Sequence, residues 1–287
     1  MTQKQTRRTF LKRSFSITVG SLLATSLGYY YARYIEPKQL SIVHQNISHQ
    51  LIPKNFEGLK IVQFSDLHIG YNYNLKQLQN AVNKINEEKP DIVLFTGDLI
   101  DSPMTFKDAD KIPPILESIQ APLGKYSIYG NHDHGGYGSN LYLEIMNKAK
   151  FTLLVNESTV ISLPDGNQIC LVGVDDLLLG HPDYDKALEN VPQELFTILL
   201  AHEPDAAHLT SKYPIHLQLS GHSHGGQVQL PFFGPLITPP LATTYVEGFY
   251  EVEESNLSIY VNRGIGTTRL PFRFLSKPEI TVFHLNA

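Results

Sequence analysis

The sequence predicts an α/β protein in which two packed, mixed β-sheets are flanked by helices. From residue 40 onward, short β-rich runs alternate with amphipathic helical stretches, which is the pattern of a layered α/β domain. The strand-like runs outnumber the helical ones, which favours two sheets over one. The 287 residues are 42% hydrophobic and 18% charged, so one large core can form and a disordered or fibrous chain is excluded.

A βαβ unit is expected near the start of this domain. Residues 60–64 are expected to form its first strand. Asn74 suits the N-cap of a helix that Pro90 ends, and residues 91–95 then form a buried strand. One face of the helix is apolar and consists of Leu75, Leu78, Val82 and Ile85.

The rest of the domain is expected to be mostly β-strand. A hairpin across Asp165-Gly166 is expected to join residues 159–163 to residues 168–174. Further strands are expected at residues 126–129, 197–200, 217–219, 227–230, 258–261 and 279–285.

Five of the predicted strands end in clusters of Asp, Asn or His. The clusters are Asp66-Leu67-His68, Gly97-Asp98-Leu99-Ile100-Asp101, Gly130-Asn131-His132-Asp133, Ala201-His202-Glu203 and Gly221-His222-Ser223-His224. In open α/β sheets, sites gather beyond the carboxyl ends of strands, so we expect the five clusters to converge on one crevice.

The side chains in these clusters suit divalent metal ions. Seven candidate ligands stand out: Asp66, His68, Asp98, Asn131, His202, His222 and His224. Carboxylate, amide and imidazole ligands without thiolates favour Mn, Fe or Zn. Seven ligands are too many for one four-coordinate site but suffice for two divalent metal ions that share a bridging carboxylate.

The ordered motifs D-x-H, G-D-x-x-D, G-N-H-D, His and G-H-x-H resemble the calcineurin-like metallophosphoesterase family. All five occur in order across residues 60–226. Residues 262–273 are further similar to the exported branch that includes phosphodiesterases related to UDP-2,3-diacylglucosamine hydrolases. The resemblance implies the metallophosphoesterase four-layer sandwich as the fold.

The resemblance also implies a role for each candidate ligand. It assigns Asp66, His68 and His224 to the first ion, and it assigns Asn131, His202 and His222 to the second. Asp98 would bridge the two ions.

Three further residues would support the reaction. The resemblance makes His132 a catalytic residue that hydrogen-bonds the phosphate or protonates the leaving alkoxide. Asp133 would hold the ring of His132, and Asp101 would lie behind the ligands. Ser223 is expected to be a small spacer rather than a nucleophile, because the G-x-S-x-G motif is absent there.

The implied reaction is hydrolysis of a phosphodiester or pyrophosphate bond by in-line attack of a hydroxide that bridges the ions. The expected substrate is a phosphorylated small molecule, lipid-linked compound or wall polymer of the cell envelope. A phosphomonoesterase is an alternative, as is a catalytically silent, wall-associated metal-binding protein.

Residues 1–36 are expected to direct export and to lie outside the fold. Residues 6–12 resemble a twin-arginine signal and precede nineteen uncharged residues, 14–32. The segment is expected to be a signal peptide or an N-terminal membrane anchor, and residues 37–287 form the metallophosphoesterase domain. The expected partner is the twin-arginine export machinery. The expected location is the cell surface, the cell wall or the outer side of the membrane.

The charge distribution argues against nucleic acid as a partner. The whole chain has a formal charge of −5. The first 36 residues contribute +5, from Lys4, Arg7, Arg8, Lys12, Arg13 and Arg33 against Glu36, so the remainder carries −10. A body this acidic lacks the basic surface that binds phosphate backbones.

Several features leave two interpretations open. Arg263, Arg269 and Arg273 would suit a second phosphate or would serve structural pairing. Residues 231–241 are apolar and proline-rich, and would pack in the core or form a lip that contacts lipid or membrane. The only cysteine, Cys170, excludes an intramolecular disulfide and is expected to be buried.

Overall fold

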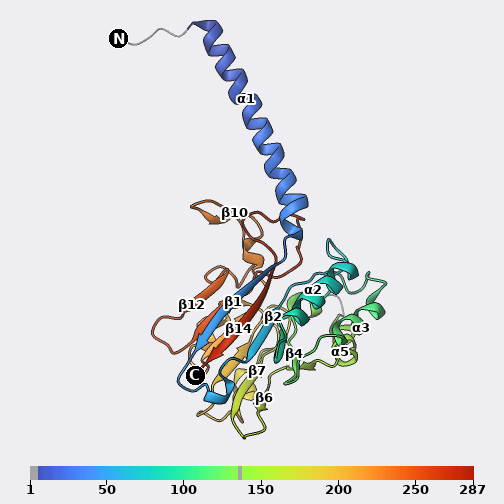
Figure 1. Cartoon of the computed structure of the whole chain (residues 1–287), viewed down its shortest axis with the longest axis vertical. Coiled ribbons are helices and arrows are strands. Elements are labelled where there is room, and N and C mark those ends of the chain that lie inside the picture. The colour runs from blue at the N-terminus through green and yellow to red at the C-terminus, as the bar shows by residue number, and fades with distance from the viewer. Residues whose placement is uncertain (1–5, 135–137) are drawn as a thin grey trace.

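The computed structural model describes residues 6–134 and 138–287. Its body contains two six-stranded mixed sheets packed face to face, with helices on the outer faces (Figure 1). Short 3-10 turns connect several elements, at Lys54–Phe56, Ala109–Lys111, Pro204–Ala206 and His224–Gly226. This architecture confirms the predicted fold class.

The first sheet has the order β1-β14-β2-β3-β4-β5. Its strands are β1 (Ser41–Ser48), β14 (Glu279–Asn286), β2 (Lys60–Phe64), β3 (Ile92–Phe95), β4 (Lys125–Ser127) and β5 (Thr152–Leu153). Strands β2 to β5 run parallel, whereas β14 pairs antiparallel with β2. The carboxyl ends of β2, β3 and β4 therefore meet at one edge.

The second sheet has the order β12-β13-β9-β8-β7-β6. Its strands are β12 (Gly248–Glu251), β13 (Ser258–Val261), β9 (Leu217–Ser220), β8 (Thr197–Leu200), β7 (Gln168–Gly173) and β6 (Glu157–Ser162). The four central strands are parallel, and the antiparallel strands β6 and β12 form the edges. The hairpin expected across Asp165-Gly166 joins β6 to β7.

Apolar side chains fill all three spaces between the layers. Ile61 and Leu94 of the first sheet meet Leu171 and Ile198 of the second in the central core. Three helices cover the outer face of the first sheet: α2 (Leu75–Glu87), α3 (Ile112–Glu117) and α5 (Ser139–Lys148). The short helices α6 (Tyr184–Leu188) and α7 (Ala207–Thr210) cover the second.

Local sequence signals explain most of these elements. Asn74 caps α2 as expected and forms a reciprocal capping box with Gln77, which satisfies two backbone N–H groups at the helix start. Strand β3 is buried along its whole length, so its apolar residues are continuous rather than alternating. The strand expected at 227–230 is only β10 (Gln229–Leu230), which pairs with β11 (Gly234–Pro235) in a small separate hairpin.

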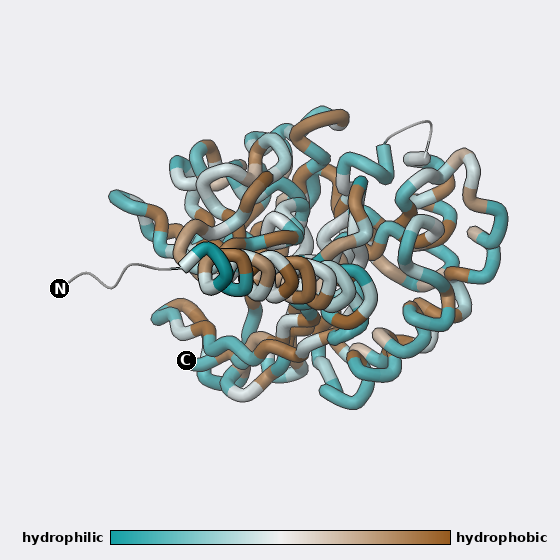
Figure 2. The backbone as a smooth tube through the Cα atoms, turned by 90° about the horizontal axis from the view of Figure 1, so that it is seen from above, coloured by the Kyte–Doolittle hydropathy of each residue, from teal (hydrophilic) through white to brown (hydrophobic). Residues whose placement is uncertain are grey.

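The N-terminal helix α1 (Arg7–Tyr30) projects from the body (Figure 1). It continues into a π-helical turn at Tyr31–Ile35 and a 3-10 turn at Glu36–Lys38. Seen from above, its hydrophilic beginning gives way to apolar and neutral residues (Figure 2). Among the described residues, no helix is long and apolar enough to qualify as a membrane span. Lys4 lies outside the described residues.

The end of this N-terminal segment packs on the body. The N–H of Arg273 donates to the carbonyl of Ala32 at 3.0 Å. Glu36 is buried, and its carboxylate accepts the N–H of Ser276 at 2.6 Å. The packed structure therefore begins before residue 37, where we expected the domain to start.

Candidate metal centre

The carboxyl ends of five parallel strands converge where the two sheets meet. Strands β2, β3 and β4 lead to Asp66, Asp98 and Asn131, and strands β8 and β9 lead to His202 and His222. The buried side chain of Gln63 joins the two sheets beneath this point, since its amide donates to the carbonyl of Ser220 and the hydroxyl of Thr96, both at 3.0 Å.

The predicted ligand atoms form two adjoining groups. Asp66, His68 and His224 present ligand atoms that all lie within 4.8 Å of one another, and so do Asp98, His202 and His222. Asp98 lies between them, with its Oδ2 atom 3.4 Å from Nε2 of both His68 and His202. A further overlapping group of His68, Asp98 and His132 places His132 beside both.

Five of the seven predicted ligands have left-handed backbone conformations. These are Asp66, His68, Asp98, His222 and His224, with φ between 45° and 66°. Non-glycine residues adopt this region at a cost of roughly 1–3 kcal/mol each, and such residues cluster at functional sites. All five residues lie in the loops that directly follow strands β2, β3 and β9.

Two glycines allow the chains to approach closely here. Gly97 has φ +95°, and a Cβ atom on it would lie 2.6 Å from the backbone nitrogen of Gly130 and 2.8 Å from the His202 ring. A Cβ atom on Gly221 would overlap Ser65 and the carboxylate of Asp66.

Backbone carbonyls orient two of the imidazole rings. Nδ1–H of His202 donates to the carbonyl of Thr96 at 2.6 Å, and Nε2–H of His222 donates to the carbonyl of Pro240 at 2.9 Å. These bonds leave Nε2 of His202 and Nδ1 of His222 as the nitrogens with free lone pairs. Asp101 lies behind His68, with 3.3 Å between Oδ1 and Nδ1.

Some buried atoms in the crevice lack any hydrogen-bond partner among the described residues. Oδ1 of Asn131 and Nε2 of His202 have none among the described residues. Buried polar atoms are costly unless they bind something. Both atoms are ordinary metal ligands, so the donor set fits divalent cations.

The surroundings of the candidate ligands shift their pKa values in different directions. Burial would raise the pKa of Asp98, but His202 and His68 outweigh it and hold that pKa well below its usual range. Burial and the neighbouring His202 lower the pKa of His222 to about 4, so its imidazole is neutral near pH 7. His222 thus has the neutral state that a metal-binding imidazole requires. Burial would lower the pKa of His202, but Asp98 and Asp66 outweigh it and hold that pKa well above its usual value.

The structure corrects the role expected for Asp133. Its carboxylate accepts the backbone N–H groups of Asp98, Leu99 and Gly130, at 2.8–3.0 Å, rather than contacting the His132 ring. Burial and the charge of Asp98 raise the pKa of Asp133 to about 7. The His132 ring is instead held by the carbonyl of Asp101, 2.8 Å from Nδ1.

The three arginines of residues 262–273 differ in burial and in hydrogen-bond partners. Arg273 is fully buried and donates to several backbone carbonyls, including Gly266 at 2.6 Å, so it is structural. Arg263 pairs with Glu279 at 2.6 Å. Arg269 is exposed. Of the two interpretations, structural pairing therefore holds for Arg263 and Arg273.

An additional polar pair was missed in the sequence. Nε2 of His134 lies 2.6 Å from Oδ1 of Asp175, at the end of β7. Asp176 and Glu203 are buried nearby, with 3.1 Å between the Glu203 carboxylate and the backbone N–H of Leu177. The rule that polar residues follow parallel strands would have identified Asp175 and Asp176.

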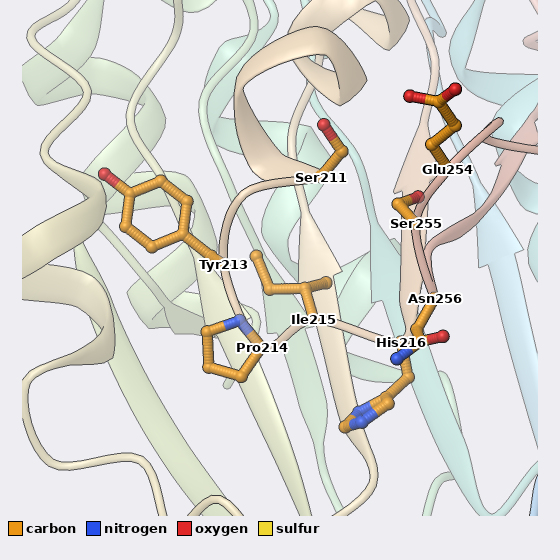
Figure 3. Close-up of a pocket in the computed structure, with 8 residues that line it drawn as sticks. All are labelled: Ser211, Tyr213, Pro214, Ile215, His216, Glu254, Ser255 and Asn256. Carbon is orange, nitrogen blue, oxygen red and sulfur yellow. The ribbon is translucent and has the colours of Figure 1, made fainter.

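The crevice adjoins one of the cavities in the described structure. A cavity of about 440 Å³ is lined by Asn131, His132, Leu179 and the loop at residues 101–105. A larger, polar cavity of about 550 Å³ lies at His216, at the opposite end of β9 from His222 (Figure 3). Only the first cavity borders the predicted ligands.

The fold and these strand-end clusters define a metallophosphoesterase, and the chain belongs to the calcineurin-like phosphoesterase family, whose sequence profile matches residues 59–226. It is 50% identical over 285 residues to the uncharacterised metallophosphoesterase YkuE of Bacillus subtilis, covering 99% of each chain. It is 32% identical over 280 residues to phosphodiesterase YaeI of Escherichia coli, covering 96% of this chain and 98% of that one.

A third relative has a named substrate. The chain is 30% identical over 315 residues to the UDP-2,3-diacylglucosamine pyrophosphatase LpxG of Chlamydia trachomatis, covering 90% of this chain and 93% of the relative.

Proposed function

We propose that this protein is an exported phosphodiesterase or pyrophosphohydrolase with two metal ions. The observation that carries the proposal is the position of Asp98, whose carboxylate lies equally close to a histidine of each ligand group. One carboxylate between two sets of ligands is the arrangement that holds a pair of divalent ions.

Each ion would have its own set of ligands. Asp66, His68 and His224 would hold the first, and Asn131, His202 and His222 the second, with Asp98 shared. Two such ions would lower the pKa of a water molecule and neutralise charge on the phosphoryl oxygens. Ligands without thiolates favour Mn, Fe or Zn.

His132 would donate a proton to the leaving oxygen. Its Nδ1 atom faces the carbonyl of Asp101, so Nδ1 carries one proton. In the imidazolium form Nε2 would carry the second proton, which is the one available to the leaving oxygen. The backbone N–H of His132 donates to Oδ1 of Asp98 at 2.9 Å, which fixes the residue beside the shared carboxylate. The catalytic acid is thus positioned by the same residue that would bridge the ions.

The cavity beside His132 favours a diester or pyrophosphate over a monoester. Pro103, Met104 and Leu179 give it apolar walls, and none of the described residues that line it is Lys or Arg. A monoester dianion would need additional positive charge, whereas a second substituent on phosphorus needs room. The names of YaeI and LpxG, a phosphodiesterase and a pyrophosphatase, support the same preference.

The proposed location is outside the cytoplasmic membrane, with an envelope component as substrate. Arg7 and Arg8 are exposed in the first turn of α1, where an export receptor has access to them. The relative LpxG acts on a nucleotide-linked lipid, which supports a lipid-linked or wall-polymer substrate for this chain.

A comparison of two aryl esters tests the proposed activity. Purified full-length protein with Mn²⁺ should hydrolyse bis(p-nitrophenyl) phosphate faster than p-nitrophenyl phosphate. The opposite ratio would identify a phosphomonoesterase. Two bound metal ions with no turnover of either ester, or of pyrophosphate substrates, would identify a catalytically silent metal-binding protein.

A further inference from the structure

An exposed apolar hairpin lies at the same end of the molecule as α1. The β10–β11 hairpin stands beside the foot of that helix (Figure 1). At its tip, Phe232 is 104% exposed and Phe233 is 84% exposed. Leu236 and Ile237 follow and are also exposed, so packing of residues 231–241 in the core is excluded as the explanation of their composition.

Two neighbouring segments add exposed apolar side chains. The foot of α1 exposes Tyr30 and Tyr34, and the C-terminal segment exposes Leu270 and Leu275. We call residues 27–35, 227–241 and 267–277 together the apolar platform. Large exposed apolar surfaces on a folded protein usually mark a binding surface.

Backbone pairing joins the three segments of the platform. Val228 forms a bridge with Phe274, whose carbonyl accepts the N–H of Gln229 at 2.9 Å. The adjacent Arg273 donates its N–H to Ala32 at the foot of α1. The segments therefore form one continuous surface rather than three separate loops.

The charge of the platform is opposite to that of the body. Its three segments contain no Asp or Glu, and they contribute Arg33, Arg269 and Lys277 at partly or fully exposed positions. Residues 37–287 otherwise carry a large excess of acids. Aromatic and aliphatic tips surrounded by cations suit a surface that is apolar inside and anionic outside.

We propose that the apolar platform docks on an anionic lipid bilayer, with Phe232 and Phe233 entering the acyl region and the cations contacting lipid phosphates. A second copy of the chain fits less well. Two-fold pairing would place the same cations of both copies in one interface, where they repel. The proposal does not depend on the proposed hydrolysis.

The docked orientation would hold the metal centre close to the membrane. His222 is bonded to the carbonyl of Pro240 within the platform. The amide of Gln229 donates to the carbonyl of Gly225, next to His224, at 3.0 Å. The platform is thus hydrogen-bonded directly to one predicted ligand, His222, and to the residue that follows another, His224.

Vesicle flotation of the full-length protein tests the proposal. The wild type should float with vesicles of phosphatidylglycerol and phosphatidylcholine, and more weakly with phosphatidylcholine alone. Phe232→Ser with Phe233→Ser should reduce partitioning by at least about tenfold, since each Phe buries a large apolar area. Phe249→Ser, at an exposed aromatic of β12, should leave it unchanged. Equal partitioning of both variants and the wild type would overturn the proposal.

A fluorescent label separates hairpin insertion from binding by α1 alone. Cys170 is buried, and burial raises its pKa to about 11, so a thiol introduced by Phe233→Cys would be labelled selectively. An environment-sensitive dye there should shift to the blue on vesicles, whereas the same dye at Phe249→Cys should not. No shift at position 233 in protein that floats would contradict the proposal. A blue shift that appears in concentrated protein without vesicles would show that a second copy of the chain covers the platform.

Discussion

Asp98 contacts residues of both ligand groups at the candidate metal centre. One carboxylate oxygen lies between His68 and His202, and the other accepts the backbone N–H of His132. Its left-handed backbone and its burial are both unfavourable for an ordinary aspartate. These two costs to stability favour a chemical role for Asp98 over a structural one.

Asp98→Asn should therefore abolish turnover without unfolding the protein. We expect metal-dependent hydrolysis of bis(p-nitrophenyl) phosphate to fall roughly a thousandfold, because an amide cannot supply two anionic ligand positions. Circular dichroism should show an intact fold. Asp110→Asn, at an exposed carboxylate, serves as the matched control. Retention of wild-type turnover by Asp98→Asn would contradict the bridging role.

His132→Ala should affect substrates according to their leaving group. For an alkyl ester, loss of the proton donor should lower kcat by about a hundredfold or more. For a p-nitrophenyl ester the loss should be much smaller, since that leaving group departs without a proton. Metal content should stay unchanged. An equal loss for both esters with metal retained would instead assign His132 to hydrogen-bonding the phosphate. A loss of metal would assign it a role in metal binding.

For single residues, the sequence predicted which side chains lie in the crevice but not which backbone groups they bond. The order of the five motifs identified the residues that gather in the crevice. The carbonyls of Thr96 and Pro240, which orient His202 and His222, belong to residues whose side chains carry no such signal. The error for Asp133 has the same origin, since its partners are three backbone N–H groups.

Among the elements, strands and helices with a clear apolar pattern were predicted well. The boundaries of β2, α2 and the β6–β7 hairpin lie within a few residues of expectation. Residues 227–230 look like a strand in sequence, but they leave the second sheet and pair within the platform. Their polar and apolar alternation fits a sheet edge as well as a hairpin, so the sequence alone does not distinguish the two.

The pair that links helix α4 (Asn131–His134) to the end of β7 should give stability a defined pH dependence. The hydrogen bond that the His134 ring donates to the Asp175 carboxylate raises the pKa of His134. Burial would raise the pKa of Asp175, but His134 outweighs it and lowers that pKa. The stabilisation that comes from the raised pKa of His134 is fully present below the unfolded pKa of about 6.5. It is lost as the pH rises through the raised pKa of the folded state. The stabilisation that comes from the lowered pKa of Asp175 is fully present above its unfolded pKa of about 3.9 and is lost as the pH falls through the lowered pKa.

His134→Ala should therefore destabilise the protein more at pH 5.5 than at pH 9. We expect the variant to lose about 1 kcal/mol of unfolding free energy at the lower pH, because the pair is only partly screened by solvent. Urea unfolding at the two pH values measures the difference. A cost that is equal at both would show that the interaction does not involve the charged imidazole.

Helix α1 carries the test of export. Replacing Arg7 and Arg8 together by Lys preserves the charge of the helix start but removes the paired guanidinium groups that the twin-arginine pathway recognises. We expect the variant to accumulate in the cytoplasm while the wild type reaches the envelope, as fractionation and immunoblotting would show. The change Lys12→Arg is the control. Equal export of both variants would exclude the twin-arginine route.

For the whole molecule, the two sheets act together as one scaffold. Each contributes part of the predicted ligand set, and the buried side chain of Gln63 crosses between them. The first sheet supplies Asp66, Asp98 and Asn131, and the second supplies His202 and His222. The sequence predicted that their strand ends converge, but the contact between the platform and the centre depends on tertiary packing that no local pattern encodes.

Anomalous diffraction from crystals loaded with Mn²⁺ tests the central claim most directly. Two peaks per chain are predicted, on either side of the Asp98 carboxylate, one beside His68 and the other beside His202. One peak, or none, at saturating Mn²⁺ would contradict a two-metal centre formed by these residues.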